Sequence, residues 1–132
     1  MKAISSSATR GINVDSVINC ADNSGAKTLN LIAVKTYKGT KRKKPAAAMG
    51  DLVVCSVVKG DVKKRHEVVL AVIIRQKKEY RRANGMRIRF EDNAAVLVND
   101  RGEPTGTEIK GPVAREAVER FSAIGKIASQ VV

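Results

Sequence analysis

Short apolar runs, separated by polar and turn-forming segments, dominate the pattern of this chain. Residues 68–74 form an unbroken apolar run rich in β-branched side chains, which predicts a buried β-strand. Residues 94–98 predict a second buried strand. Between them, the largely basic residues 75–82 lead to Asn84-Gly85, the dipeptide best suited to a two-residue type I′ turn. Residues 86–90 then alternate apolar and basic, so the whole stretch predicts two buried strands joined by a basic hairpin.

The turn determines which side chains of this hairpin face each other. If Asn84-Gly85 is the whole turn, Arg82 faces Arg87 and Tyr80 faces Arg89. Like charges in facing positions destabilise a strand pair by roughly a few tenths of a kcal/mol, so such a hairpin suits a polyanionic partner. An ordinary solvated hairpin with extended basic side chains is the alternative. The side predicted to be basic consists of Lys78, Tyr80, Arg82, Arg87 and Arg89.

Other short strands are predicted on both sides of a basic loop. Residues 14–20 and 27–37 indicate a first hairpin, and residues 51–59 indicate another buried strand. A glycine-bounded loop with four consecutive bases and a proline is expected over residues 39–50. Four to six short strands at near-regular spacing favour a small closed barrel. One face of the second strand is expected to carry Leu29, Leu31, Ala33 and, at its end, Lys35.

The two ends of the chain differ from this β pattern. Gly111-Pro112 places a proline at the first position of a predicted helix that runs to Phe121, and residues 122–129 suggest a second helix interrupted by Gly125. Glu116 and Arg120, four positions apart, are interpreted as a surface pair.

A single domain over residues 1–132 accounts for this organisation. Residues 1–13 are polar and aperiodic and are interpreted as an extension that becomes ordered only on a partner. The barrel is expected over residues 14–100 with the hairpin at 75–90, followed by a loop and short helices over residues 101–132.

The charge of the chain indicates a kind of partner. The formal net charge of the 132 residues is +12, and the basic residues are concentrated in the middle of the chain. Residues 35–89 contain 17 of the 25 bases and only 4 of the 13 acids. Self-repulsion of this size is usually tolerated when an acidic partner neutralises it, and adjacent bases suit a phosphate backbone. The residues predicted to contact such a polyanion, which the family resemblance described below implies is RNA, are Lys41, Arg42, Lys43, Lys44, Lys63, Lys64, Arg65, Lys77, Lys78, Tyr80, Arg81, Arg82, Arg87 and Arg89.

Reactive or metal-binding chemistry has little support. Cys20 and Cys55 are far apart, with His66 as the only histidine, so we expect no metal, no cofactor and small buried thiols. An enzyme that uses either cysteine with His66 would lack an orienting carboxylate, so the chain is predicted not to be an enzyme. No apolar run approaches membrane-spanning length and no signal peptide is evident, so we expect a soluble, intracellular chain without a membrane partner.

Several spaced motifs, over roughly residues 14–121, resemble one family. The chain is similar to the fourteenth protein of the universal large-subunit ribosomal set, and its N-terminal dozen residues and basic residues 75–82 look more like the archaeal and eukaryotic branch. The longest motif starts with residues 71–74, continues after nine intervening residues with Asn84-Gly85 and after four more with Phe90, and ends with Asn93 and Val96-Leu97. The other motifs are residues 18–26, Gly50-Asp51, Gly106-Thr107 and residues 111–113.

The resemblance implies a mainly β fold: a five-stranded β-barrel with a protruding basic β-hairpin and a short α-helical C-terminal region. It also implies a cytoplasmic protein of the ribosome that binds large-subunit ribosomal RNA at the subunit interface and contacts small-subunit ribosomal RNA in an intersubunit bridge. Neighbouring large-subunit proteins, including the third, and an anti-association factor are the implied protein partners. Glu108 stands where bacterial relatives carry a base, so their contacts do not transfer there. The implied partner surface consists of Thr107, Glu108, Lys110, Arg115 and Glu119.

The favoured function is that of a structural constituent of the large subunit. Recognition by shape and phosphate contact is expected, because two Phe, two Tyr and no Trp do not make a stacking platform for single-stranded RNA. The alternative is a free RNA-binding chaperone or regulator of small-barrel type.

Overall fold

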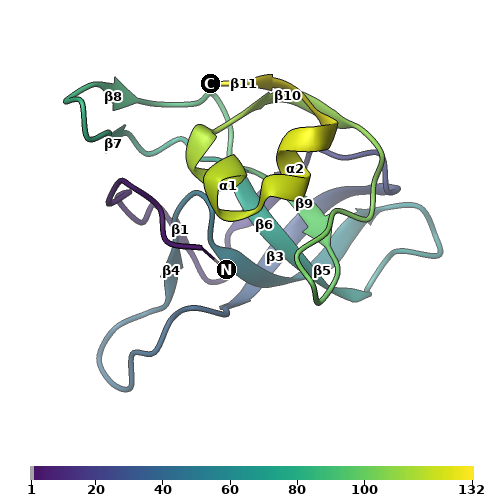
Figure 1. The fold of residues 1–132 in the computed structure, drawn as a ribbon. Coiled ribbons are helices and arrows are strands. Elements are labelled where there is room, and N and C mark those ends of the chain that lie inside the picture. The colour runs from purple at the N-terminus through teal and green to yellow at the C-terminus, as the bar shows by residue number, and fades with distance from the viewer. Residues whose placement is uncertain (1) are drawn as a thin grey trace.

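A closed β-barrel forms the centre of the computed structural model, which describes residues 2–132 (Figure 1). Neighbouring strands are antiparallel, except that the first and last pair in parallel and close the barrel. Closure leaves no free sheet edge, which confirms the predicted five-stranded barrel. In spatial order the strands are β2 (Val17–Cys20), β3 (Ala26–Val34), β5 (Leu52–Gly60), β6 (Val68–Arg75) and β9 (Ala94–Val98).

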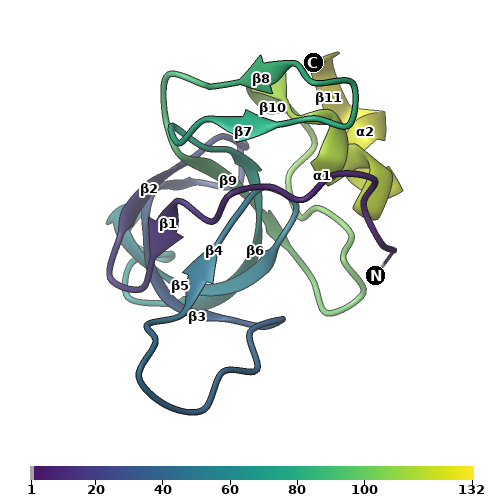
Figure 2. The same ribbon diagram turned by 90° about the vertical axis from the view of Figure 1, so that its left-hand side faces the viewer.

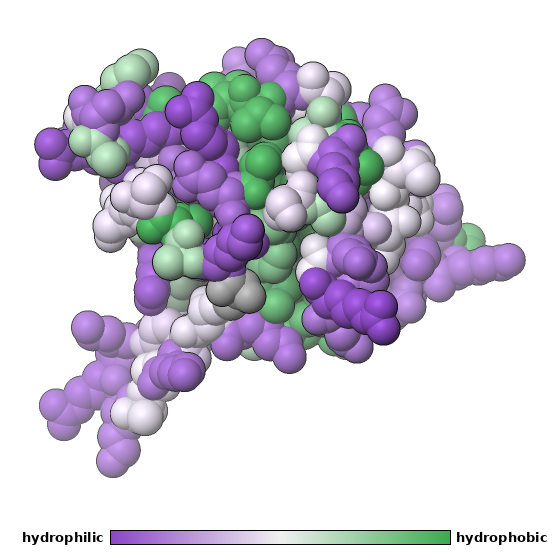
Figure 3. Space-filling view, viewed as in Figure 1, coloured by the Kyte–Doolittle hydropathy of each residue, from purple (hydrophilic) through white to green (hydrophobic). Residues whose placement is uncertain are grey.

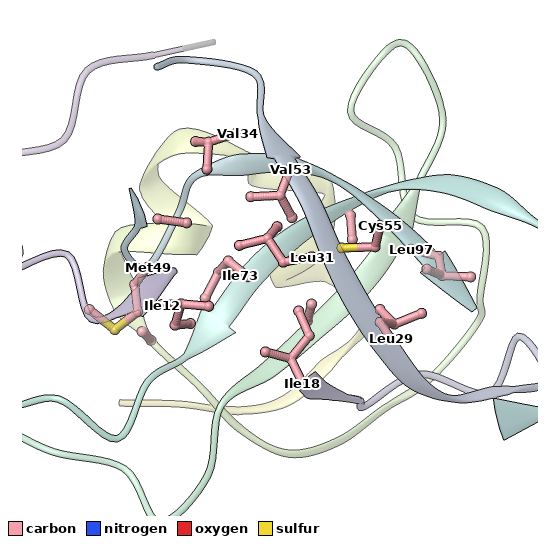
Figure 4. Close-up of a cluster of buried hydrophobic side chains, with 14 of the residues drawn as sticks. Ile12, Ile18, Leu29, Leu31, Val34, Met49, Val53, Cys55, Ile73 and Leu97 are labelled. Carbon is pink, nitrogen blue, oxygen red and sulfur yellow. The ribbon is translucent and has the colours of Figure 1, made fainter. Parts of the chain in front are cut away.

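Alternate side chains of these strands fill the barrel interior (Figure 4). The predicted inward face of β3 is confirmed for Leu29 and Leu31, but Ala33 is exposed and Val34 is buried in its place. A register irregularity between Leu31 and Ala33 in the pairing with β5 explains the difference. Such a bulge shifts the alternation of side chains by one residue, so the next apolar residue turns inward.

A second apolar layer covers the outside of β6 and β9. Strand β10 (Ile109–Val113), helix α1 (Arg115–Arg120) and helix α2 (Ser122–Ile127) pack there. Both faces of β6 and β9 are therefore buried, which explains why their sequences are continuously apolar rather than alternating. The buried side chains of this layer include Val72, Ile74, Val96, Val98, Ile109, Val113, Ala117 and Ile124.

The C-terminal region differs from the prediction in three places. Pro112 lies in β10, not at the start of a helix, because Arg75 Nη1 donates hydrogen bonds to the Lys110 and Pro112 carbonyls and holds the strand extended. Helix α2 is not interrupted at Gly125 but continues through it. The glycine allows α2 to approach α1 closely, because a Cβ at this position would lie 2.7 Å from a Val118 methyl group. The chain then forms β11 (Ala128–Val131), which pairs in parallel with β10.

Two short strands extend the core beyond the predicted barrel. Strand β1 (Ile12–Asn13) pairs with β4 (Ala46–Ala47), and Ile12 is 1% exposed. The predicted extension is therefore wrong for Ile12 and Asn13, because both lie in a strand and Ile12 belongs to the core. The second half of the predicted 39–50 loop is also core, since Met49 is buried. Residues 2–11 lie along the domain in Figure 2, and Thr9 accepts a hydrogen bond from Gln76.

The basic hairpin, which we call the ribbon (residues 75–90), projects from the barrel beside the C-terminal elements (Figures 1 and 2). It contains β7 (Tyr80–Arg81) and β8 (Arg87–Ile88). Helices α1 and α2 have six residues each, and no helix among residues 2–132 is long and apolar enough to cross a membrane.

Adjacent residues of β3 provide a test of the barrel interior. Replacement Leu31→Ala removes a fully buried side chain and is expected to lower the free energy of unfolding by about 2–5 kcal/mol. Ile32→Ala is the matched control, because that side chain is 42% exposed and its loss should cost about 1 kcal/mol or less. Urea unfolding followed by circular dichroism measures both, and equal losses would contradict the inward orientation of Leu31.

Candidate nucleic-acid interface

The pairing of the ribbon differs by one residue from the prediction. Tyr80 pairs with Ile88 and Arg81 with Arg87. Arg82 N donates to Met86 O over 2.8 Å, so the turn comprises three residues, 83–85. The Asn84 side chain accepts a hydrogen bond from Met86 N, and Gly85 adopts a φ of 88°, as three-residue hairpin turns with a left-handed glycine require. The expected facing pairs Arg82–Arg87 and Tyr80–Arg89 are therefore wrong.

This shift divides the predicted basic side between two faces of the ribbon. Arg81 and Arg87 are exposed on the outer face, whereas Tyr80 turns toward the domain and is fully buried. On the outer face Arg81 lies opposite Arg87, so two like charges face each other. Glu79 forms a salt bridge of 2.9 Å with Arg87, and both side chains are exposed. One carboxylate therefore offsets part of the repulsion, while the face stays net positive.

The inner face of the ribbon is fastened to α1 by a buried carboxylate. Glu116 Oε2 accepts a hydrogen bond from the Tyr80 hydroxyl at 2.9 Å, and Glu116 Oε1 accepts one from Arg82 Nε at 2.9 Å. Arg82 Nη2 also donates to the Val132 main-chain oxygen over 2.6 Å. We call Tyr80, Arg82, Glu116 and this Val132 oxygen the Glu116 cluster. It joins the ribbon, α1 and the residue after β11.

Glu116 was expected to form a surface pair with Arg120, and that interpretation is wrong. Its side chain is only 4% exposed, and Arg120 instead bonds Asp51 over 3.2 Å. The sequence contained one signal of this role, since Glu116 lies next to Ala117 on the apolar face of α1. An acid on the buried face of a helix requires a partner, and Arg82 supplies it.

The electrostatics of the cluster follow from burial and pairing. Burial, together with the neighbouring Glu116 carboxylate, raises the pKa of Tyr80 to about 12. Burial alone would lower the pKa of Arg82, but its hydrogen bonds to Glu116 and Tyr80 outweigh this effect and raise that pKa. The phenol therefore stays protonated and the guanidinium charged, which is the state that the hydrogen bonds require.

A second buried ion pair holds the base of the ribbon. Arg75 is 8% exposed and forms two hydrogen bonds to Asp92, at 2.9 Å and 3.2 Å. Burial would raise the pKa of Asp92, but hydrogen bonds from Arg75 and Asn19 outweigh it and lower that pKa. The first base of the ribbon thus has a structural role, which its position in a basic run did not indicate.

The exposed bases among the predicted contact residues form two groups on one side of the molecule and a third group elsewhere. The ribbon and the loop between β3 and β4 project from the same side in Figures 1 and 2, at opposite ends of the domain, and Figure 3 shows hydrophilic residues on both. The loop between β5 and β6, which contains residues 63–65, projects from the opposite side. The exposed predicted residues of the first two groups are Lys41, Arg42, Lys43, Lys44, Lys77, Lys78, Arg81, Arg87 and Arg89.

The predicted protein-partner residues are all exposed but lie on two elements. Thr107, Glu108 and Lys110 lie at the start of β10, where the Asn23 side chain accepts hydrogen bonds from the Thr107 and Glu108 main chain. Arg115 and Glu119 lie one turn apart on α1. The surface is therefore divided between a strand end and a helix.

No reactive centre accompanies these surfaces within residues 2–132. Burial raises the pKa of Cys55 to about 12, and burial with the Asp22 carboxylate does the same for Cys20. Both are therefore protonated thiols at neutral pH and poor nucleophiles. The described residues hold no cluster of three or more His, Cys, Asp and Glu side chains suited to a metal ion. The chemical groups that these surfaces present are therefore charged side chains on a folded backbone.

Comparisons with known proteins point to one family. Residues 11–132 match the family model described as Ribosomal protein L14p/L23e. The large ribosomal subunit protein uL14 of Halorubrum lacusprofundi is 51% identical over 132 residues, which cover all of both chains. The uL14 protein of Methanothrix thermoacetophila is 54% identical over 123 residues, 93% of each chain, and that of Halobacterium salinarum is 47% identical over 132 residues, all of both chains.

Removal of the buried carboxylate tests the Glu116 cluster. Glu116→Ala leaves the Arg82 charge without its partner and is expected to lower the free energy of unfolding by about 3–5 kcal/mol. Glu119→Ala, an exposed acid one turn further along the same helix, is the control and should change it by about 0.5 kcal/mol or less. Urea unfolding measures both variants. Similar losses in the two would show that Glu116 is not the anchoring group.

The raised pKa of Tyr80 predicts a loss of stability in alkali. The native state holds the phenol proton more tightly than the unfolded chain, so this contribution is complete below pH 10 and is lost as the pH rises to about 12. Relative to Tyr80→Phe, the wild-type protein should lose about 2 kcal/mol of unfolding free energy over this range. Thermal or urea unfolding at pH 9 to 12 measures the difference, and parallel pH profiles would contradict the buried phenol.

Proposed function

Because this chain belongs to the ribosomal protein L14p/L23e family, we propose that it is a structural constituent of the large ribosomal subunit that binds ribosomal RNA. The family is one of ribosomal proteins and not of enzymes. The outer face of the ribbon is the observation that carries the RNA-binding part: its bases are exposed while its inner face is held by the Glu116 cluster. The protein thus presents a basic ribbon whose backbone is already held in place before binding.

Contact with phosphates at two separate points is the proposed mode of binding. The ribbon and the 41–44 loop project from one side of the domain, so a folded RNA surface can touch both at once. Phosphate contact positions a protein by shape and does not read bases, which suits arginine and lysine without neighbouring aromatic platforms. Tyr80 and Arg82 are assigned to positioning the ribbon, because Tyr80 is buried and Arg82 is engaged by Glu116. Residues 63–65 are proposed as a contact to a different part of the RNA.

The protein contacts are proposed at two exposed patches, the start of β10 and the part of α1 next to the ribbon turn. Their residues carry mixed charge and therefore suit protein partners better than RNA. They are Thr107, Glu108, Lys110, Arg115 and Glu119. The proposed protein partners are the third large-subunit protein, as a neighbour, and an anti-association factor. We also propose that the protein lies at the subunit interface of the cytoplasmic ribosome and contacts small-subunit RNA in an intersubunit bridge.

Charge reversal on the outer face of the ribbon tests the RNA-binding proposal. Arg81→Glu/Arg87→Glu should lower affinity for a transcribed archaeal large-subunit ribosomal RNA at least tenfold at 0.1 M salt. If each arginine neutralises one phosphate, the slope of log affinity against log salt should decrease in magnitude by about 1.4–1.8. Filter binding over a salt series gives both quantities.

The matched control for this experiment reverses two exposed bases elsewhere, Arg101→Glu/Lys126→Glu. This control has the same net charge as Arg81→Glu/Arg87→Glu and should bind the RNA several-fold more tightly than that variant. Equal weakening of the two variants would mean that only net charge matters and would refute the ribbon as the contact surface. Sedimentation of the wild-type protein mostly apart from large subunits at physiological salt would favour a free RNA regulator instead.

A further inference from the structure

The N-terminal segment bends beneath the turn of the ribbon (Figure 2). Residues of both segments line a small hollow. Its volume is about 230 Å³, enough for a phosphate group. Three hydroxyl groups and two guanidinium groups line it, and no carboxylate does. We call it the serine hollow. Its lining residues are Ser5, Ser6, Ser7, Arg81, Arg82 and Ala83.

The serine hollow contains donors that the rest of the chain does not use. Ser6 Oγ is buried and has no hydrogen-bond partner among the described residues. Arg81 is exposed and forms no salt bridge within residues 2–132. In the same part of the chain, the hydrogen bonds of Arg82 use Nε and Nη2 and leave Nη1 available. Buried hydroxyl groups are nearly always paired, so Ser6 Oγ is an unusual donor beside the hollow, and the exposed Ser7 is the hydroxyl-bearing residue that a ligand can reach directly.

The Glu116 cluster makes this site rigid. Arg82 is fixed through Nε and Nη2, so Nη1 is held in place before any ligand arrives. The two nearby carboxylates, Glu116 and Glu119, line a neighbouring hollow and not this one. Glu116 is neutralised by Arg82, and Glu119 accepts a hydrogen bond from Ser5. The lining of the serine hollow therefore carries the charges of Arg81 and Arg82 and no carboxylate.

We propose that the serine hollow binds one phosphodiester group of the ribosomal RNA, an inference that rests on the function proposed above. Phosphate oxygens accept hydrogen bonds from arginine and from serine hydroxyls, and the lining offers both kinds of donor. The hollow lies next to Arg81, which belongs to the outer face of the ribbon, so a backbone that follows this face reaches it. Residues 5–7 are then part of the RNA-binding surface, although their sequence suggested only a polar extension.

Removal of the hydroxyl groups tests this site without a change in charge. Ser6→Ala/Ser7→Ala in the full-length chain should bind a transcribed archaeal large-subunit ribosomal RNA about fivefold more weakly, the usual effect of lost hydrogen bonds, with an unchanged salt slope. Ser122→Ala/Ser129→Ala, with exposed serines on α2 and β11, is the control and should bind like wild type. Equal urea midpoints in both variants exclude unfolding as the cause.

The outcomes separate this inference from the function on which it rests. If wild-type protein shows no salt-dependent RNA binding, the proposed function fails. If wild-type protein binds and the two serine variants bind equally well, the serine hollow is not an RNA contact. Amide NMR with inorganic phosphate gives a second arm, in which residues 5–7 should shift in wild type and not in Arg81→Gln. Phosphate-induced shifts combined with unchanged RNA affinity of Ser6→Ala/Ser7→Ala would indicate a free-anion site and overturn the proposal.

Discussion

The buried carboxylate of Glu116 is the interaction on which the arrangement of the basic surface depends. An isolated carboxylate inside a protein is costly, and this one is stabilised by Tyr80 and Arg82 from the ribbon. The same contacts fix a two-stranded ribbon that would be only marginally stable alone. Since Arg82 also bonds the Val132 main-chain oxygen, ribbon, helix α1 and C-terminal segment form one unit. A protein with a net charge of +12 thus uses part of its basic sequence to hold the remainder in place.

This division of roles explains how a strongly basic hairpin is tolerated. Buried Arg75 and Arg82 are neutralised by Asp92 and Glu116, while exposed Arg87 is only partly offset by Glu79. The bases that remain exposed on the ribbon are those of its outer face and its base, including Lys77, Arg81 and Arg87. Such pre-positioning reduces the conformational entropy that binding would otherwise cost. The serine hollow has the same arrangement, because Glu116 holds Arg82, one of its lining residues, in place.

Much of the fold could be predicted from the sequence, because its signals are local. The apolar run at residues 68–74 indicated a buried strand, and Asn84-Gly85 placed the turn. The ribbon register could not be predicted, since it depends on whether the Asn84 side chain accepts the Met86 amide and makes a three-residue turn. The contacts of Tyr80 and Arg82 with Glu116 could not be predicted either, because Glu116 lies 34 or more positions away along the chain. Strand alternation in the expected register placed Arg87 on the basic side and Arg81 on the opposite side, so their shared outer face could not be predicted. The unpaired Ser6 hydroxyl could be found only in the tertiary structure.

Lysine reactivity on intact large subunits tests the central claim most directly, that the outer face of the ribbon lies against RNA. Purified archaeal large subunits containing this protein, and the free protein, would be acetylated under identical conditions and compared by mass spectrometry. The account predicts strong protection of Lys77 and Lys78, and of Lys41, Lys43 and Lys44, in the subunit, while Lys126 on α2 serves as an internal reference. Full reactivity of the ribbon lysines in the assembled subunit, equal to that in the free protein, would contradict it.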